Sequence, residues 1–332
     1  MKSQYEKKRL ITFDRIKIKS NYKYLLNTKV KFNEMFHSRS GEKIGIFYSS
    51  KDDINIPYNL YVAVSYIKQT LTLEFSSKIL KEKYPDLISK DTIKECLTNI
   101  NQLNICDIDV DSILSNGAIT SVDVTYDANL ILSDNLLDVL NSQVHNYRRF
   151  KWVHYDKEGI TFTKDVKSKD CVETITLYNK EKEICTSRNK DFLNRLSQPQ
   201  AVMDYFKGKT RFEITLDTPK KIMNYLNLAD TQISSVLNSD TNPILIQFDK
   251  VFGNSTTNIS DTTFDDYENW AMKIILEKYK GDLKLLEQDV RSKFSSRSGA
   301  TKRMKKFETV YHAMTSASTS ENPIEKIRNL LL

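Results

Sequence analysis

The sequence predicts an α+β protein, with an antiparallel or mixed sheet and helices in its first two-thirds and a mainly helical C-terminal region. Up to about residue 228, short stretches rich in β-branched and aromatic residues alternate with helix-like stretches. Beyond that point strand patterns become rare, and apolar residues recur every three or four positions, as in amphipathic helices. We therefore expect two regions, residues 1–228 and residues 229–332.

Six stretches have the composition of strands. They are residues 10–19, 71–76, 120–127, 160–163, 173–179 and 211–216. The helix-like stretches are residues 91–100, 133–147, 267–279, 282–294 and 303–314. A further helix is expected after Thr218, which has an N-cap side chain and is followed by Pro219 at the first helical position.

The first region contains an internal repeat. Glu74 lies in a strand that precedes a helix start, and Glu213 lies in a strand with the same arrangement. Each of these segments follows an earlier strand with one aspartate, Asp14 in the first half and Asp123 in the second. The pattern predicts two related βαβ-like halves, with chance similarity as the alternative.

The composition is that of a folded protein, with 39% hydrophobic and 28% charged residues among 332. The sequence has no run of 18 apolar residues, and its first residues lack the apolar core of a signal peptide. We therefore expect a cytoplasmic protein without a membrane partner. None of the four cysteines forms a C-x-x-C pair, which argues against a zinc site. The net charge of +7 favours polyanions only weakly, because the whole sequence is rich in lysine.

Three of the predicted strands have a polar face with a central carboxylate. Side chains alternate between the two faces of a strand, so Asp123 shares a face with Thr125, and Glu213 shares one with Thr215. Glu74 lies on a polar face in the same way. Carboxylates gathered from neighbouring strands repel one another unless a cation offsets their charge, and oxygen ligands suit Mg²⁺ or Mn²⁺. The alternative is a solvated sheet face whose acids pair with Lys and Arg.

Tyr178 and Lys180 form a second candidate pair. Strand alternation predicts that they share one face of the stretch that begins at residue 173. A nearby metal ion or ammonium group lowers the pKa of a phenol from about 10 and makes the phenolate available as a nucleophile. Because the sequence has 17 tyrosines, the alternative is that Tyr178 is an amphipathic packing residue.

Five segments, in order, are similar to segments of known DNA-nicking proteins. They are residues 73–80, 120–126, 176–183, 210–214 and 298–306. Together they resemble the gene II type replication initiators of filamentous phages and related plasmid rolling-circle initiators. Residues 176–183 resemble the family's Tyr-x-Lys-x-x-Glu segment, and residues 210–214 resemble its Arg-Phe-Glu strand. The chain lacks the His-hydrophobic-His motif of the wider group of His-motif nicking enzymes.

The resemblance implies an enzyme that nicks and rejoins one DNA strand at an origin, through a covalent 5′-phosphotyrosine. Carried over to this sequence, it makes Tyr178 the nucleophile and Lys180 its partner. It also implies bound Mg²⁺ or Mn²⁺. The implied metal ligands are Asp123 and Glu213, with Glu183 and Glu74 as further candidates.

DNA contacts are expected at two basic stretches that contain aromatic residues. Their cations are Arg148, Arg149, Lys151, Lys302, Arg303, Lys305 and Lys306. A solvated basic face is the alternative for each stretch. The expected partners are single-stranded or supercoiled origin DNA, a host helicase and a polymerase. Two other functions remain open, a non-catalytic DNA-binding replication factor and a metal-dependent nuclease without a covalent intermediate.

Overall fold

The structure is a computed structural model. It describes residues 11–142, 144, 152–156, 159–166, 173–252, 267–279, 283–294, 296–316 and 323–332. In this part of the chain the fold is α+β, as predicted, and every strand lies at or before Leu216. None of the helices found there combines the length and apolar character needed to cross a lipid bilayer.

The elements have the following bounds. The strands are β1 (Phe13–Asn21), β2 (Leu25–Thr28), β3 (Asn33–Phe36), β4 (Lys43–Ser49), β5 (Leu60–Ser65), β6 (Thr70–Ser76), β7 (Cys106–Ile108), β8 (Ala118–Ala128), β9 (Trp152–Asp156), β10 (Gly159–Lys164), β11 (Thr174–Asn179) and β12 (Thr210–Leu216). The 3-10 helices are η1 (Tyr22–Tyr24), η2 (Ser50–Asp52) and η3 (Ser77–Asp86). The α-helices are α1 (Ile93–Gln102), α2 (Val110–Asn116), α3 (Asp134–Ser142), α4 (Lys180–Ile184), α5 (Ser187–Leu193), α6 (Pro199–Phe206), α7 (Pro219–Leu226), α8 (Ile233–Leu237), α9 (Pro243–Phe252), α10 (Tyr267–Lys278), α11 (Leu283–Lys293), α12 (Arg297–Ser316) and α13 (Pro323–Leu331).

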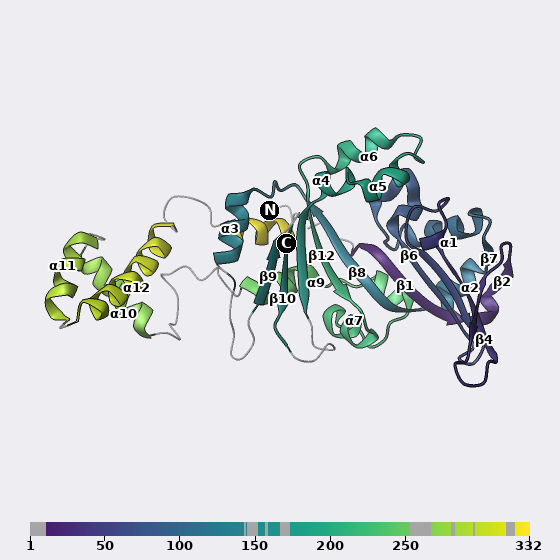
Figure 1. Ribbon diagram of the computed structural model, residues 1–332, viewed down its shortest axis with the longest axis horizontal. Coiled ribbons are helices and arrows are strands. Elements are labelled where there is room, and N and C mark those ends of the chain that lie inside the picture. The colour runs from purple at the N-terminus through teal and green to yellow at the C-terminus, as the bar shows by residue number, and fades with distance from the viewer. Residues whose placement is uncertain are drawn as a thin grey trace, which may run out of the picture. The chain divides into compact units, whose positions relative to one another are not determined.

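Among the described residues, ten strands form one sheet in the order β3-β4-β5-β6-β1-β8-β12-β11-β10-β9 (Figure 1). All neighbouring pairs in this sheet are antiparallel. The sheet therefore differs from the expected βαβ-like halves, which would contain parallel pairs. The reason is that short connections join most strands that are consecutive in the chain, and such connections permit antiparallel pairing only.

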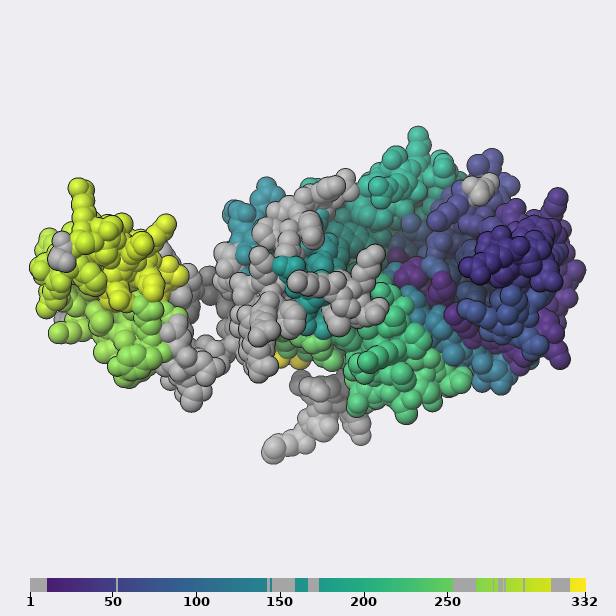
Figure 2. All heavy atoms as spheres, turned by 60° about the horizontal axis from the view of Figure 1, so that its bottom comes forward, coloured from purple at the N-terminus to yellow at the C-terminus, as the bar shows by residue number. Residues whose placement is uncertain are grey.

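The sheet consists of two halves with the same topology. In the first half β1 pairs with β6, and β5, β4 and β3 follow in that order. In the second half β8 pairs with β12, and β11, β10 and β9 follow. The two halves meet at the antiparallel pair β1–β8. A space-filling view shows the purple and blue residues of the first half next to the teal and green residues that follow them in the chain (Figure 2).

The strand register relates the two halves residue by residue. Arg15 of β1 lies opposite Asp123 of β8, at the centre of the sheet. Their partners on the outer side are Ser76 of β6 and Thr215 of β12, respectively. Two positions before each partner, the strand carries a glutamate. These are Glu74 and Glu213, the two residues that the sequence repeat also matches.

One face of the sheet is apolar and is covered by helices. Its side chains include Ile16, Leu73, Val122 and Ile214, each at most 2% exposed. In the second half, α7 and α9 pack against β12 and β8, and in the first half α2 packs against β1. At one end of the strands, η3 and α4–α6 pack around a second cluster of buried residues that contains Tyr84 and Phe206 (Figure 1). The opposite face keeps the polar side chains.

The described residues divide into two compact units. One extends to Phe252 and includes Leu331 and Leu332, and the other comprises the described residues from Tyr267 to Leu330. The first unit therefore extends beyond the boundary expected at residue 228, because α8 and α9 pack on the apolar face of the sheet. In the second unit, α10, α11 and α12 enclose their own core. Its buried members are Met272, Leu276, Leu286, Val290, Ala300, Met304 and Phe307.

Each of the six predicted strands overlaps an observed one, and the helix after Thr218 begins as predicted, with the Thr218 side chain accepting from Lys221 N–H. The pattern did not predict β2–β5, β7 or β9. β2, β3 and β7 have at most four residues each, so they are too short to show clear alternation.

Candidate active site

Polar side chains from β8, β11 and β12 meet on the polar face of the second half. Tyr178 of β11 lies opposite Arg211 of β12, and Thr176 lies opposite Glu213. On the other side of β12, Arg211 lies opposite Asp127 of β8. Residues directly opposite each other point to the same face, and β-strand alternation returns to that face every second residue. Tyr178, Glu213 and Arg211 therefore share one face, close to the end capped by α4 and α6.

Tyr178 and Glu213 are in direct contact. The phenol hydroxyl of Tyr178 donates a hydrogen bond to Oε2 of Glu213 over 3.3 Å, although the residues are 35 positions apart in sequence. Burial and then the nearby charges of Asp14 and Asp123 raise the pKa of Glu213 from 4.5 to about 7. Burial, together with the charge of Glu213, also raises the pKa of Tyr178 well above 10. The phenol is thus neutral at pH 7 and needs additional positive charge to ionise.

The residue opposite Tyr178 on the neighbouring strand has no side chain. Gly159 of β10 lies opposite Tyr178. A Cβ atom at Gly159 would lie 2.4 Å from the Cβ atom of Tyr178 and 2.4 Å from the carbonyl oxygen of Leu177. Only glycine therefore fits beside Tyr178.

Lys180 begins a helix rather than continuing the strand. β11 ends at Asn179, whose side chain caps α4 by accepting from Lys182 N–H, and Lys180 is the first residue of α4. The strand alternation expected for Lys180 therefore does not apply. The Lys180 side chain is only 2% exposed, and its Nζ lies 5.6 Å from the centroid of the Tyr178 ring. Burial and the charge of Arg211 lower the pKa of Lys180 to about 8.

Glu183 is fixed as the acidic partner of Lys180. Its Oε2 lies 2.5 Å from Nζ of Lys180. The side-chain amide of Asn189, which is 1% exposed, donates to Oε1 of Glu183 over 3.0 Å and to its backbone carbonyl over 2.7 Å. Lys78 in turn donates to the amide oxygen of Asn189. Asn189 therefore holds Glu183 in place, and Glu183 in turn binds Lys180. The sequence patterns did not indicate a structural role for Asn189 or Lys78.

Arg211 is the buried cation of the site. Its side chain is fully buried and forms two hydrogen bonds to Asp127, of 2.7 and 2.8 Å. It also donates to the hydroxyl of Tyr84 over 3.1 Å and lies 3.2 Å from Oδ1 of Asp14. Arg211 lies on β12 two positions before Glu213, and the sequence alone indicated no role for it. The guanidinium group thus contacts side chains from three segments that are far apart in sequence, those of Asp127, Tyr84 and Asp14.

Asp14 is a second residue whose place in the site was missed. Burial raises the pKa of a carboxyl, but Arg211 and Lys180 outweigh it and lower the pKa of Asp14 to about 2. Its carboxylate also accepts a hydrogen bond of 2.5 Å from Ser77. Asp14 is therefore a permanent negative charge beside Glu213. The only sequence signal for it was the repeated strand in which it lies.

Asp123 and Glu74 are both paired with cations. Arg15 binds Asp123 through two hydrogen bonds, of 2.7 and 2.9 Å, and also donates to Glu74 over 3.1 Å. Thr215 adds a third hydrogen bond to Asp123, and Lys17 contacts Glu74 at 3.0 Å. These two carboxylates thus have the Lys and Arg partners that the alternative interpretation of the polar face expected.

Of the acids implied as metal ligands, Glu213 alone has no ion pair with a cation in the described part of the chain. Among the residues described, no group of three or more His, Cys, Asp and Glu side chains is arranged to hold a metal ion. In the same part of the chain no Lys or Arg forms an ion pair with Glu213, whereas Asp14, Asp123, Glu74 and Glu183 each have one. Mg²⁺ needs only one or two protein carboxylates, because water and substrate phosphates complete its octahedron.

The expected DNA-binding residues belong to two stretches of the sequence, of which the structure describes one. Arg148, Arg149 and Lys151 are outside the described residues. The other four lie on α12 in the second unit. Lys302 and Lys305 are exposed there, whereas Arg303 and Lys306 both bind Glu268 of α10, at 2.5 and 2.8 Å. Lys302 and Lys305 are therefore the freer cations for phosphate contacts.

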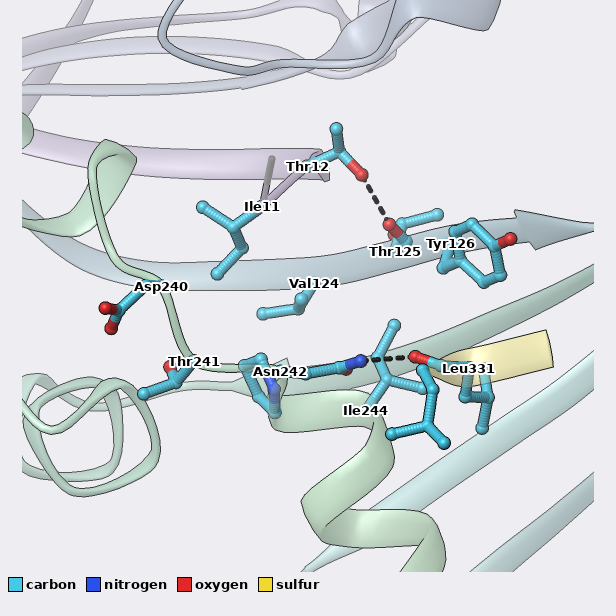
Figure 3. A pocket seen from close by; sticks show the side chains of 12 residues that line it. Ile11, Thr12, Val124, Thr125, Tyr126, Asp240, Thr241, Asn242, Ile244 and Leu331 are labelled. Carbon is cyan, nitrogen blue, oxygen red and sulfur yellow. Dashed lines mark hydrogen bonds between the residues drawn. The ribbon is translucent and has the colours of Figure 1, made fainter. Parts of the chain in front are cut away.

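A pocket of about 160 Å³ is lined by a different set of residues (Figure 3). Val124 and Tyr126 of β8 line it on the apolar side, together with Asn242 and Ile244 at the start of α9. Asn242 closes one wall by donating to the carbonyl oxygen of Leu331 (Figure 3). The pocket contains none of the predicted site residues.

No protein-family model, no curated protein and no solved structure matches this chain.

Proposed function

We propose that this protein nicks and rejoins single-stranded DNA at an origin of rolling-circle replication, with Tyr178 as the nucleophile. The observation that carries the proposal is the hydrogen bond from the Tyr178 hydroxyl to Glu213, a carboxylate without an ion-pair partner in the described chain. Two buried cations, Lys180 and Arg211, lie around the Tyr178 ring. Packing of a phenol alone does not require such charges. Perturbed titratable groups gathered in this way are typical of catalytic sites.

In this mechanism Glu213 orients the phenol and would hold Mg²⁺ or Mn²⁺. When bound there, the cation would supply positive charge that lowers the pKa of the phenol and polarises the scissile phosphate. The Tyr178 hydroxyl releases its proton to solvent water, and the resulting phenolate oxygen attacks phosphorus in line. A bond forms between that oxygen and phosphorus, and the bond from phosphorus to the 3′ oxygen breaks.

The products of nicking are a 5′-phosphotyrosine and a free 3′-hydroxyl, which takes up one proton. Lys180, clamped by Glu183, offsets the negative charge that develops on the phosphate. The phosphotyrosine bond conserves the energy of the phosphodiester. A later 3′-hydroxyl can therefore attack it and rejoin the strand without ATP.

A covalent-adduct assay tests the proposal. The protein is incubated with a labelled single-stranded oligonucleotide library and Mg²⁺, and protein-bound label is measured after denaturing electrophoresis. We expect an adduct with the natural chain and none with Tyr178→Phe, which removes one oxygen atom. Tyr225→Phe is the matched control, because Tyr225 also donates a hydrogen bond, to Gln247, but lies on α7 away from the polar face.

The same assay separates the other two functions. Cleavage that persists in Tyr178→Phe would indicate a metal-dependent nuclease that uses water. Binding of the oligonucleotide without cleavage or adduct, at any Mg²⁺ or Mn²⁺ concentration, would indicate a non-catalytic DNA-binding factor. Either result contradicts the role of Tyr178 as nucleophile.

A further inference from the structure

The first half of the sheet repeats the backbone of the active half without its nucleophile. Tyr178 lies opposite Arg211 on the second half, two residues before Glu213. The equivalent pair in the first half is Ala63 of β5 opposite Thr72 of β6. The first half therefore has neither the phenol nor the buried guanidinium, and it cannot carry out the same chemistry.

Two aromatic rings stand on this half of the polar face instead. Tyr61 of β5 lies opposite Glu74, and Phe47 of β4 lies opposite Ala63, so both rings point to the same face as Glu74. Their centroids are 6.0 Å apart, with 33° between the ring planes, and both side chains are half-buried. In the active half the equivalent of Phe47 is Gly159, opposite Tyr178. The halves thus differ in where they place their aromatic rings.

Three cations lie in a row on β1, which is separated from β5 and Tyr61 by one strand, β6. Arg15, Lys17 and Lys19 alternate along β1 and lie opposite Ser76, Glu74 and Thr72 of β6. Arg15 and Lys17 share Glu74, while Lys19 is exposed at the outer end of the row. We name Phe47, Tyr61, Lys17 and Lys19 the N-terminal platform. It combines flat apolar rings with positive charge on one open sheet face.

We propose that the N-terminal platform binds unpaired bases of the DNA strand that Tyr178 cleaves. Aromatic rings accept any base by stacking, and neighbouring cations bind the phosphates between the bases. The platform shares the polar face with Tyr178, so a single strand crossing the sheet reaches both. β5 and β11 are five strands apart in the sheet order, which is about 24 Å at the usual strand spacing. This inference rests on the proposed function for its substrate.

Unpaired DNA fits this face better than duplex DNA does. A duplex keeps its bases stacked on each other, so that protein rings cannot stack on their flat sides, whereas a single strand exposes those sides. Glu74 lies next to the platform, and that carboxylate already binds Lys17 and Arg15. The strand therefore meets rings and net positive charge on β1, β4 and β5.

Fluorescence anisotropy of a labelled oligonucleotide tests the platform. The full chain is used with the Tyr178→Phe change and with EDTA, so that binding is measured without cleavage. We expect Tyr61→Leu to weaken single-strand binding roughly tenfold and Phe47→Leu/Tyr61→Leu more, in line with the loss of base stacking. Tyr66→Leu is the matched control, because Tyr66 is 42% exposed in the β5–β6 turn. Binding of a duplex should be unchanged by all three.

Salt dependence gives an independent measurement. Lys17→Gln/Lys19→Gln should reduce the slope of log affinity against log salt by about 1.4, that is, about 0.7 for each lost phosphate contact on a single strand. This double change removes charge from exposed and half-buried positions and leaves the rings in place. Thermal unfolding of each variant identifies any change that acts through the fold.

A base analogue locates the contact along the strand. With 2-aminopurine placed at successive positions, we expect quenching at positions several nucleotides from the cleaved phosphate, and its loss in Tyr61→Leu. An abasic nucleotide at the quenched position should weaken binding as much as Tyr61→Leu, and the two changes together should not add. Equal binding by Tyr61→Leu and Tyr66→Leu, or an unchanged salt slope, would overturn the proposal.

These results separate the platform from the nicking reaction. If the natural chain forms no covalent adduct but the platform variants lose binding, the nucleophile role of Tyr178 fails and the platform stands. If the adduct forms and the platform variants bind as the parent does, the platform fails and the reaction stands.

Discussion

The two halves of the sheet share a topology, but their two equivalent glutamates have opposite electrostatic environments. Glu74 is paired with Lys17 and Arg15, which outweigh burial and lower its pKa. Glu213 has no such pair in the described chain, and its pKa is raised to about 7. The repeated backbone places both carboxylates on the same polar face. The side chains around each carboxylate, rather than the fold, set its charge state, and they make Glu213 the one suited to the proposed reaction.

The largest effect is expected at Arg211, which distinguishes the active half most clearly. Arg211→Met would leave the buried carboxylate of Asp127 without its partner, because that side chain is only 3% exposed. Removing one member of a buried ion pair costs roughly 3–5 kcal/mol, and we expect the free energy of unfolding to fall by that amount. Urea unfolding measures it.

The counterpart of Arg211 in the first half provides the control. Thr72→Val should change the free energy of unfolding by less than about 0.5 kcal/mol, as for other partly exposed sheet positions. If both variants lose similar stability, the two halves do not differ in how their polar faces are stabilised. The comparison would then lose its physical basis.

The next effect concerns activity at the two glutamates. Glu213→Gln keeps the hydrogen-bond acceptor for Tyr178 but removes the charge that would hold Mg²⁺. We expect adduct formation to slow on the order of 100-fold. Glu74→Gln should slow it less than about threefold, since Glu74 is already neutralised by cations. The measurement is single-turnover adduct formation at saturating Mg²⁺, and equal losses would argue against a special role for Glu213.

The strands were predictable because alternation depends on short stretches of sequence. The face shared by Arg211, Glu213 and Thr215 follows from counting alternate residues, and the register bears it out: these residues pair with Asp127, Thr125 and Asp123 of β8. The register between distant strands cannot be obtained in that way. It is set by the pairing of β1 with β8, whose residues Arg15 and Asp123 are 108 positions apart.

The site was predictable only where its residues are close in sequence or on named strands. Tyr178, Lys180 and Glu183 come from one segment, and the structure keeps them together. Asn189 was missed because an asparagine in a short helix has no distinguishing pattern. The pairing of Asp123 with Arg15 was missed because Arg15 is one of several cations in an amphipathic strand, and the sequence does not distinguish it from the others.

A pH titration of stability tests the environment of Glu213. Its pKa rises from 4.5 in the unfolded chain to about 7 in the fold, so folding favours the protonated form. The stabilisation is therefore complete below pH 4.5 and is lost as the pH rises to about 7. The loss amounts to up to about 3 kcal/mol. We expect the metal-free protein to lose this stability between those pH values, as measured by urea unfolding.

Two controls isolate Glu213 from other titrating groups. The difference in stability between the natural chain and Glu213→Gln should carry the whole effect, because glutamine does not titrate. At pH 8, millimolar Mg²⁺ should restore stability to the natural chain but not to Glu213→Gln, since a ligand stabilises the state that binds it. A natural chain that is equally stable at pH 5 and pH 8 without metal would contradict the raised pKa.

The smallest effect on stability is expected at Lys17, in the half without the nucleophile. Nζ of Lys17 lies 3.0 Å from Glu74, and the two side chains are 34% and 20% exposed. Such partly exposed pairs contribute at most about 1 kcal/mol, and Arg15 remains as a partner of Glu74. Lys17→Met should therefore unfold at nearly the same urea concentration as Lys43→Met, which breaks the exposed pair with Glu34.

Only Lys17→Met should weaken single-strand binding, because Lys17 alone of the two belongs to the platform. A loss of more than 2 kcal/mol in Lys17→Met, well above that upper limit, would mean that Glu74 depends on Lys17 for its charge balance, and the first half would then resemble the active half more than its ion pairs indicate.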